Sequence, residues 1–507
     1  MTSILELPSC SIWNATAPGE PFPSLTGDID VDVAVIGAGI VGLTTAWLLK
    51  SAGCKVAVIE ARRVAAQVTG GSTAKITSQH GVVYSELIDR HGEEAARRYG
   101  EANEAAIDRI AAIAADVGTD CDFERKAAYV FTRSPDGVES LRAEAEAAAS
   151  LGLPASFVDS VPVGVPALGA VRFENQAQFH PRKYLLAIAA AIHGDGSHVF
   201  EETRALDVDE GSPCRVATPL GEVRAAHVIV ATNLPFLDRG GYFARAFPRA
   251  HVGIAAPIAA SAAPDGMFLC TSGAPHSVRT WRDGDVTYLI TLAEGFKPGH
   301  VQDTDALYRH LEEDTRSNYE IGPVAHRWMT EDYDSMDGLP FIGRLTPLSR
   351  HTYIATAFSA WGITTGTVAA ELLTDRVLGR ENPYAAMFDS TRLEAKGSGR
   401  FMRENLHVAR HFLTGAFKGG ERADPAELAP GQGAVLRVHG RKRAVYRKED
   451  GELVELSPYC THLGCLLSWN PADRTWDCSC HGSRFEACGE LLHGPAVADM
   501  EGAPTRR

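Results

Sequence analysis

The sequence contains no stretch of 18 apolar residues free of Gly, polar or charged interruptions, and a helix needs about that length to cross a bilayer. Its first 20 residues lack the charged region and long apolar core of a signal peptide. Basic residues are the minority, since 49 Lys and Arg stand against 64 Asp and Glu, a net charge of −15. Such a charge argues against nucleic acid or an anionic membrane as a partner. We therefore expect a cytoplasmic protein with no integral membrane segment.

Cysteine is scarce over most of the chain, and five of the 10 cysteines fall in the last 48 residues. Two motifs there each supply one Cys and one His: Cys460 with His462, and Cys478 with His481. Structural zinc sites usually pair Cys with Cys and His with His along the chain. A Rieske [2Fe–2S] cluster instead needs two thiolates on one iron and two imidazoles on the other. The spacing predicts these four residues as cluster ligands, with a zinc site or no metal as the alternative.

The segments around these ligands resemble Rieske proteins of the disulfide-bearing kind. The resemblance implies a disulfide between Cys465 and Cys480, although free thiols would be usual in a reducing cell. It also implies that the Ser483 hydroxyl donates to a cluster sulfide. Phe485 stands where quinol-oxidising relatives have Tyr, so the cluster should have a lower potential than theirs.

A second motif opens the main domain, where residues 31–36 read as a buried strand and 43–52 as a helix. The glycines between them are Gly37, Gly39 and Gly42. The first permits a tight turn, the second lets the backbone approach a pyrophosphate, and the third lets helix and strand pack closely. The next strand ends at Glu60, which is placed to accept hydrogen bonds from ribose hydroxyls. This pattern predicts a dinucleotide site.

A later glycine-rich turn at 361–366, between a predicted strand and a predicted helix, favours FAD over NAD. Together with the segments at 70–75 and 79–81, these features resemble the D-amino-acid oxidase and glycine oxidase superfamily over about residues 30–395. One subgroup joins such a domain to a C-terminal Rieske module, and the segments at 70–75 and 79–81 are among its hallmarks. The further cofactor-binding residues that the resemblance implies are Ser72, Thr73, Gly343, Gly362, Ile363 and Thr364.

Covalent attachment of FAD is not expected. Some relatives tether the flavin through a His where this chain has Lys75, and others use a Cys near the second glycine turn, where none lies between 271 and 459.

The catalytic candidates are weaker, and three of the four have a structural alternative. Lys75 would stabilise negative charge on the reduced flavin, or pair with a structural carboxylate. His80 would lie near the flavin. Arg279 would bind a substrate carboxylate in a bidentate fork, or form a surface ion pair. Trp361 would wall the flavin pocket, or serve only in packing.

The predicted fold class is α/β, with a Rossmann-like FAD-binding domain and a β-rich substrate domain, followed by a small all-β domain. We expect an N-terminal irregular segment at 1–29, a FAD-dependent oxidoreductase domain at 30–395, a partly helical linker at 396–425 and a Rieske domain at 426–507.

The expected function is that of a dehydrogenase for a small amine or amino acid. FAD would pass electrons to the cluster and on to an external one-electron acceptor, such as a ferredoxin or a quinone. One alternative reverses the electron flow, so that a flavin-dependent reductase or tailoring enzyme receives electrons through the cluster. A second alternative is a redox-sensing protein without catalysis.

Overall fold

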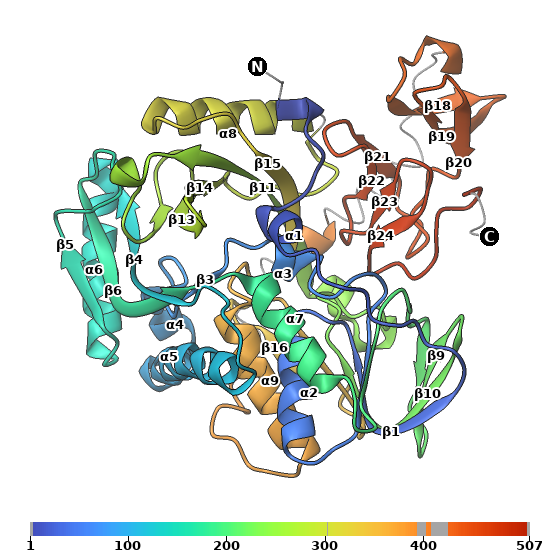
Figure 1. Ribbon diagram of the computed structural model, residues 1–507, viewed down its shortest axis with the longest axis horizontal. Helices are drawn as coiled ribbons and strands as arrows, with labels where there is room; N and C mark the ends of the chain where they lie inside the picture. The colour runs from blue at the N-terminus through green and yellow to red at the C-terminus, as the bar shows by residue number, and fades with distance from the viewer. Residues whose placement is uncertain (1–3, 302, 393–401, 407–423, 504–507) are drawn as a thin grey trace.

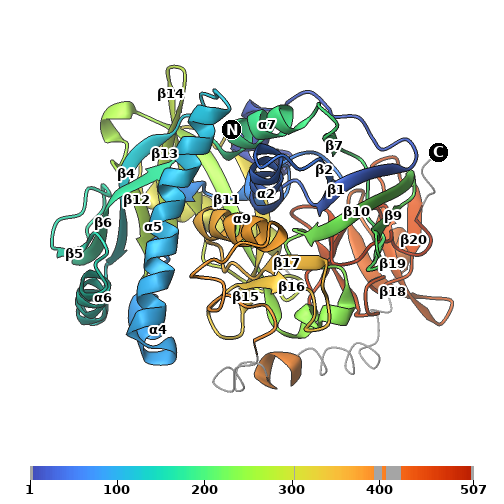
Figure 2. The same cartoon turned by 90° about the horizontal axis from the view of Figure 1, so that it is seen from below.

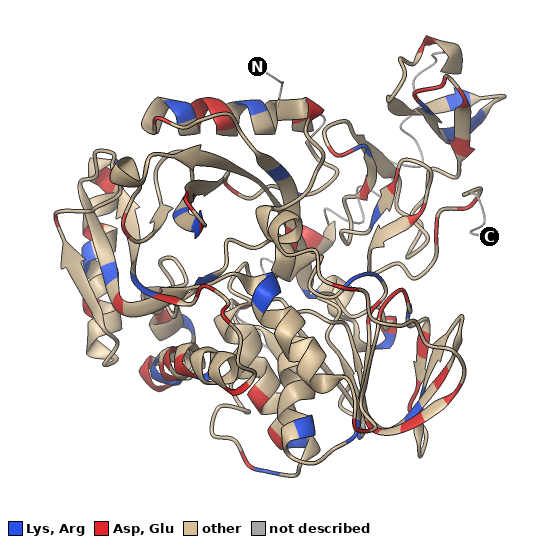
Figure 3. Cartoon of the chain, viewed as in Figure 1, with Lys and Arg blue, Asp and Glu red and all other residues tan. Residues whose placement is uncertain are grey.

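The computed structural model describes residues 4–301, 303–392, 402–406 and 424–503. Its core is a sheet with five parallel central strands and helices, beside which lie a larger mixed sheet and two small C-terminal sheets (Figure 1). Among the described residues, no helix has the length and apolar character needed to cross a membrane. On the long helices, acidic and basic residues are interspersed (Figure 3).

The first sheet has the strand order β16-β17-β10-β1-β2-β7, with β9 and β8 added beside β10. Its central strand β1 pairs in parallel with both β10 and β2. Apolar residues fill the C-terminal half of β1, which is fully buried. The strands are β1 (Ile29–Ile36), β2 (Val56–Ile59), β7 (His198–Phe200), β8 (Asp207–Asp209), β9 (Cys214–Thr218), β10 (Gly221–Val230), β16 (Phe341–Arg344) and β17 (Thr352–Thr356).

Helices cover this sheet in a layer, with α2 packed between α7 and α9, and α5 beside α9 (Figure 2). The buried faces of α2 and α9 are almost wholly apolar or small. The helices of this layer are α2 (Ile40–Ser51), α7 (Pro181–Ile192) and α9 (Thr364–Val377). Next to α9 lies α5 (Glu93–Asp116), on which α4 (Tyr84–His91) packs.

The mixed sheet has the order β15-β11-β14-β13-β12-β4-β6-β3, with β5 on β6. Helix α6 (Val138–Ser150) packs on β5 and β6, and α8 (Thr304–Asn318) packs on β11. The strands are β3 (Lys75–Ile76), β4 (Glu124–Thr132), β5 (Ala155–Val158), β6 (Gly169–Gln178), β11 (Ala246–Ile258), β12 (Met267–Cys270), β13 (Ser277–Asp283), β14 (Val286–Leu292) and β15 (His326–Ser335).

The C-terminal region forms two antiparallel sheets, β18-β19-β20 and β21-β22-β23-β24. The expected all-β character is therefore confirmed. The strands are β18 (Gly433–Val438), β19 (Arg441–Arg447), β20 (Leu453–Leu456), β21 (Leu467–Asn470), β22 (Thr475–Cys478), β23 (Arg484–Glu486) and β24 (Leu491–His493).

The N-terminal segment is more ordered than expected. It contains a short 3-10 helix η1 (Ile4–Glu6) and helix α1 (Ile12–Thr16). The Ser11 side chain caps α1 by accepting from the Asn14 N–H, and Trp13 is fully buried. Within the predicted linker, residues 402–406 are helical, and the rest of the predicted helix lies outside the described residues.

The remaining short elements lie in connections. They are α3 (Val68–Gly71), η2 (Pro135–Gly137), η3 (Asp238–Gly240), η4 (Tyr242–Ala244), η5 (Ala260–Ala262) and η7 (Pro425–Glu427).

Candidate functional site

The three fingerprint glycines connect β1 to α2, and each has a distinct local reason. Gly37 has φ +104°, and a Cβ there would lie 2.5 Å from the Ala231 carbonyl oxygen. A Cβ on Gly42 would lie 1.9 Å from the Gly37 carbonyl oxygen, so only glycine lets α2 pack this closely on the turn. Gly39 is the N-cap of α2, which begins at Ile40, three residues earlier than the sequence predicts. A helix N-terminus at this position favours a bound phosphate.

Glu60 follows β2 and faces the same turn. Its Oε2 accepts from the Ala38 N–H at 2.8 Å, and its Oε1 accepts from the Arg62 N–H at 2.9 Å. Burial raises the pKa of this carboxyl against the opposing effect of the two N–H donors. Each carboxylate oxygen carries a second lone pair, so Glu60 retains acceptor capacity for ribose hydroxyls.

These residues open onto one cavity of about 420 Å³. Its wall combines the β1–α2 turn, the loop before β3, one face of the mixed sheet, the turn before α9 and a loop of the C-terminal domain. The predicted site residues that line it are Gly37, Gly39, Glu60, Ser72, Thr73, Lys75, His80, Trp361, Gly362 and Ile363. The cavity is therefore lined by residues of the two glycine turns and of the segment between them.

Four predicted residues do not line the cavity. Gly42 packs against the turn that begins at Gly37. A Cβ on Gly343 would lie 2.9 Å from Ser390 Oγ, so Gly343 allows close packing against Ser390. Thr364 Oγ1 donates to the Thr77 carbonyl at 2.9 Å.

Arg279, the fourth, lies behind the cavity wall. Its guanidinium is fully buried and donates to the Thr73 and Ala74 carbonyls, each at 2.8 Å. It supports the loop that carries Lys75 and does not present a fork to the cavity.

Lys75 lines the cavity, but its ammonium faces partners in the mixed sheet. Nζ donates to the Phe268 carbonyl at 2.6 Å and to Ser277 Oγ at 2.7 Å. Burial, with a smaller effect from Arg279, lowers the pKa of Lys75 to about 7. A small change of environment would therefore change its charge at neutral pH.

His80 has both ring nitrogens engaged. Nε2 lies 2.8 Å from the Thr77 carbonyl oxygen and Nδ1 lies 2.5 Å from the Tyr99 hydroxyl. Nε2 thus donates and Nδ1 accepts, and burial lowers the pKa of His80 to about 3. The neutral ring stacks on Trp361 with 4.9 Å between centroids. His80 therefore holds Trp361 against the cavity.

Arg249 and His251, on the polar face formed by β11 and β15, were missed from the sequence. Arg249 and His251 alternate on β11, opposite Asp332 and Thr330 of β15, and all four line the cavity. His251 Nδ1 lies 3.2 Å from the Ala293 carbonyl oxygen, while its buried Nε2 has no partner among the described residues. The sequence signal that could have found them is that Arg249 and His251 stand two residues apart in an otherwise apolar strand, and so share one face of it.

Asp332 of this face supports the second glycine turn. Its Oδ2 accepts from the Ala360 N–H at 2.7 Å, next to Trp361. Burial raises the pKa of Asp332 to about 7.

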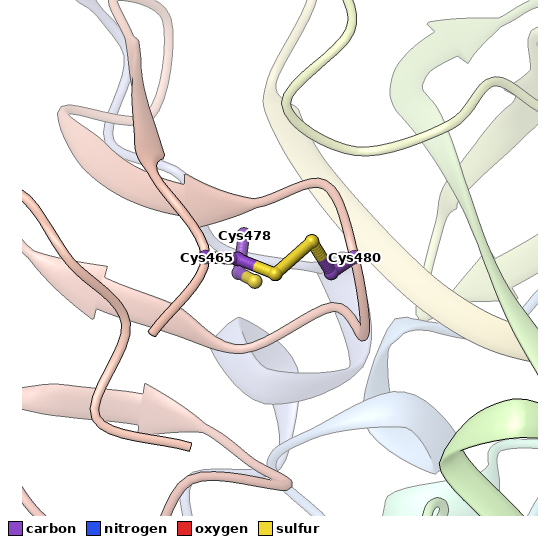
Figure 4. Close-up of side chains that lie close together, drawn as sticks. All are labelled: Cys465, Cys478 and Cys480. Carbon is purple, nitrogen blue, oxygen red and sulfur yellow. A yellow bond between two sulfur atoms is a disulfide. The ribbon is translucent and has the colours of Figure 1, made fainter. Parts of the chain in front are cut away.

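The C-terminal domain gathers the predicted cluster ligands on the two loops after β20 and β22. The sulfurs of Cys465, Cys478 and Cys480 lie within 4.8 Å of one another, and Cys465 and Cys480 form a disulfide (Figure 4). The disulfide removes those two sulfurs as thiolate donors. Cys460 and Cys478 remain, and a hydrogen bond from Cys478 lowers the pKa of Cys460 to about 7. One thiol of this buried pair is thus ready to ionise.

The two imidazoles complete a ligand set that suits a Rieske cluster. The Nδ1 atoms of His462 and His481 are buried, and neither has a partner among the described residues. The rings lie 4.9 Å apart. Burial, together with His462, lowers the pKa of His481 to about 3, so that ring is neutral as a ligand must be. Two buried thiols and two orphaned imidazole nitrogens fit one iron with two S ligands and one with two N ligands.

The C-terminal domain also closes one side of the cavity, since residues 492–497 line it. Arg62 anchors this contact from the other side. Its guanidinium lies 3.6 Å from a Glu486 carboxylate oxygen and 3.4 Å from one of Glu490.

Residues 32–376 match the family described as FAD dependent oxidoreductase (DAO), and residues 421–504 match the Rieske [2Fe-2S] domain. The chain belongs to the FAD-dependent oxidoreductase family. This oxidoreductase is 34% identical over 493 residues to the putative Rieske 2Fe-2S iron-sulfur protein YhfW of Bacillus subtilis, covering 96% of each chain. The resemblance to flavoenzymes joined to a Rieske module is thereby confirmed, and so are the two predicted cofactors, FAD and a [2Fe–2S] cluster.

Solved structures share the flavoprotein fold of this oxidoreductase. Glycine oxidase from Geobacillus kaustophilus has a TM-score of 0.60 at 16% identity, over 72% of this chain and 100% of that one. L-proline dehydrogenase from P. horikoshii has a TM-score of 0.59 at 17% identity, over 74% and 98%. The expected α/β class with a β-rich second sheet is confirmed.

Proposed function

We propose that this oxidoreductase is a dehydrogenase that oxidises the C–N bond of a small amine or amino acid and delivers electrons, through its cluster, to an external one-electron acceptor. When bound, FAD supplies two-electron uptake from the substrate carbon, and the cluster supplies one-electron transfer. The observation that carries the proposal is the single cavity shared by the dinucleotide fingerprint, the polar face of β11 and β15, and the Rieske domain.

His251 is the group best placed to handle the substrate amine. Burial lowers the pKa of His251 to about 4, so its ring is neutral near pH 7. With Nδ1–H directed at the Ala293 carbonyl, the unpartnered Nε2 is an acceptor. An amine must lose its extra proton before hydride can leave the adjacent carbon. Because a pKa of about 4 makes His251 a weak base, we assign Nε2 the role of accepting a hydrogen bond from an N–H of the deprotonated amine.

Arg249 is the cation available for a substrate carboxylate. It lines the cavity, its side chain is 46% exposed, and it pairs with Asp334 at 2.6 Å. The guanidinium has five donors in a planar fork. A carboxylate on the cavity side would use donors that Asp334 leaves, which favours an amino acid over a simple amine.

The remaining candidates have supporting roles in the proposal. Lys75 supplies a cation at the cavity wall when it is protonated. His80 and Trp361 shape the wall beside the second glycine turn. Arg279 holds the loop that carries Lys75 through the Thr73 and Ala74 carbonyls.

An anaerobic substrate screen tests the proposal. Amines and amino acids should bleach the flavin absorbance, whereas 2-hydroxy acids of matched size should not. With the active substrate, turnover with an artificial one-electron acceptor should exceed turnover with oxygen. Bleaching by hydroxy acids alone, or flavin reduction only by electrons that enter at the cluster, would overturn the proposal.

The variant His251→Gln tests the role of His251 in the same screen. It should slow flavin reduction by the active amine about tenfold, because it moves the hydrogen-bond acceptor that positions the amine. The exposed His310→Gln, on α8, is the matched control and should leave the rate unchanged.

A further inference from the structure

The two imidazoles of the cluster site are covered by the flavoprotein part of the same chain. The His462 side chain is 4% exposed, and His481 is equally buried. The covering segment is the pair of 3-10 turns η3 and η4, which follow β10. The Phe243 ring of η4 stands edge-on to both imidazoles, with centroids 6.1 Å from His462 and 5.5 Å from His481.

Asp238 makes the polar contact in this covered face. Its Oδ1 lies 2.8 Å from His462 Nε2. A carboxylate there fixes the tautomer, because Nε2 must carry the proton and the lone pair must then sit on Nδ1. Carboxylates that accept from a ligating imidazole orient the ring and raise its basicity as a ligand. The buried Nδ1 is the atom that the structure leaves without a partner among the described residues.

The contact belongs to an extensive buried interface. Tyr333 of β15 donates its hydroxyl to the His481 carbonyl at 2.9 Å. Thr304 of α8 donates to Asn470 Oδ1 at 2.6 Å. Ala472 of the Rieske domain packs in the apolar cluster formed by η1, β11 and α8. Buried hydrogen bonds and shared apolar packing indicate a fixed docked arrangement rather than a brief encounter.

The same segments reach the flavin cavity. Asn233, Leu234 and Phe236 line the cavity, and Asp238 follows two residues after Phe236. On the Rieske side, Ala496 lines the cavity, and its N–H donates to Ser483 Oγ at 3.1 Å. The N–H of Cys478 donates to the Ser483 carbonyl at 2.8 Å. Each domain therefore contributes a short connection between cavity wall and cluster ligands.

We propose that the flavoprotein domain is the docked electron partner of the cluster's histidine face, and that Asp238 is a positioning residue that holds His462 for this contact. With both groups bound, the two electrons of the reduced flavin would pass one at a time to the cluster of the same chain, which the external acceptor would reoxidise after each transfer. The external one-electron acceptor that reoxidises the cluster must then approach a face other than the one that Asp238 and Phe243 cover. The inference deepens the proposed function but depends only on its two cofactors, not on its substrate.

The first test uses the wild-type holoenzyme without substrate. The flavin is reduced by a brief anaerobic flash with deazaflavin, and cluster reduction is followed by absorbance. The rate should be first order and unchanged over a tenfold range of protein concentration. A rate that grows with protein concentration would show transfer between molecules and would overturn the proposal. Because no amine is used, a failed substrate screen cannot produce either result.

The second test changes the carboxylate. In Asp238→Asn and Asp238→Ala, the cluster's midpoint potential should rise, because removing a negative charge from the imidazole favours the reduced cluster. Asp238→Ala should also slow flavin-to-cluster transfer about tenfold or more, since it releases the ring. Asp285→Asn, on the exposed β13–β14 turn, is the control.

The variants separate positioning from a merely structural role. Asp238→Asn keeps an acceptor for Nε2–H, so it should retain most of the transfer rate while showing the raised potential. Potentials and rates that stay at the wild-type values in both variants would overturn the role of Asp238. If either variant lacks iron, the concentration series on the wild-type protein still decides the docked partner.

Discussion

Arg327 of β15 and Asp473 of the Rieske domain form an ion pair buried between the two parts of the chain. The distance from Nη1 to Oδ1 is 3.4 Å, and the two side chains are only 5% and 3% exposed. The same guanidinium donates to the Leu7 carbonyl at 2.8 Å and to the Ala472 carbonyl at 2.9 Å. One arginine therefore joins the N-terminal segment, the mixed sheet and the cluster domain.

Removing this arginine should loosen the interface. Arg327→Ala leaves Asp473 with Arg484 as its remaining cation, at 3.0 Å. We expect a loss of about 2–3 kcal/mol, less than for a carboxylate stripped of every partner. The readout is the urea midpoint of the transition that exposes the cluster, followed by its visible absorbance. The exposed pair of Arg309 with Asp303 supplies the control, and Arg309→Ala should cost less than about 1 kcal/mol. Equal effects of the two variants would contradict the buried anchor.

Substitutions at two of the fingerprint glycines should have different effects on FAD content and on stability. A Cβ on Gly39 meets only Thr69 Oγ1, at 3.3 Å, so Gly39→Val should fold but lose most of its FAD. A Cβ on Gly42 would clash with the Gly37 carbonyl, so Gly42→Ala should lower the melting temperature of the apoprotein as well. Flavin content and apoprotein melting curves separate the two outcomes. A Gly39→Val protein with full FAD would mean that its backbone does not approach the pyrophosphate.

FAD should be released when the wild-type protein is precipitated with acid. The chain has Lys75 where some relatives carry a tethering His, and Lys75 Nζ is engaged with Phe268 and Ser277. Yellow colour in the supernatant is the expected result. Flavin that stays with the denatured pellet would show a covalent bond.

The fingerprint, the second glycine turn and the candidate cluster ligands could be proposed from the sequence because each forms a local pattern. Gly37, Gly39 and Gly42 act within one turn, and Cys460 and His462 lie on one loop. Such residues keep their roles wherever the rest of the chain packs.

Arg279, Asp238 and the face of β11 escaped prediction because their roles depend on long-range pairing. Arg279 lies on β13, but its environment is set by the Ser72–Lys75 loop, about 200 residues earlier. His251 points into the cavity only because β11 pairs with both β14 and β15. Asp238 contacts a residue more than 220 positions later. No local periodicity records such contacts.

Lys75 should make stability depend on pH. Burial lowers the pKa of Lys75 from 10.5 to about 7, so the unfolded chain binds the extra proton between these values. Stability therefore rises with pH through this window, relative to a variant without the amine. From pH 7 to 9, the difference between wild type and Lys75→Met should shift by about 2–3 kcal/mol in favour of wild type. Urea unfolding of the apoproteins measures it, with Lys55→Met at the surface as the control. A difference that stays constant would mean that Lys75 keeps its charge in the folded protein.

Phe485 should set the potential of the cluster. Its ring is fully buried and packs in the same apolar cluster as Cys460 and Cys478. Phe485→Tyr offers a hydroxyl to one of these sulfurs, and a hydrogen bond to a cluster sulfur stabilises the more negative reduced state. The midpoint potential should therefore rise, while Phe485→Leu, which adds no donor, controls for the change in packing.

The effect of Phe485→Tyr on turnover identifies the slow step. If transfer from flavin to cluster limits turnover, the rate with an artificial acceptor should rise, because the cluster becomes a better oxidant. If release to the acceptor is limiting, the rate should fall, because a cluster of higher potential is a poorer donor. Redox titration decides the tuning role itself. A midpoint that stays constant or drops would mean that the ring edge points away from the sulfurs of Cys460 and Cys478.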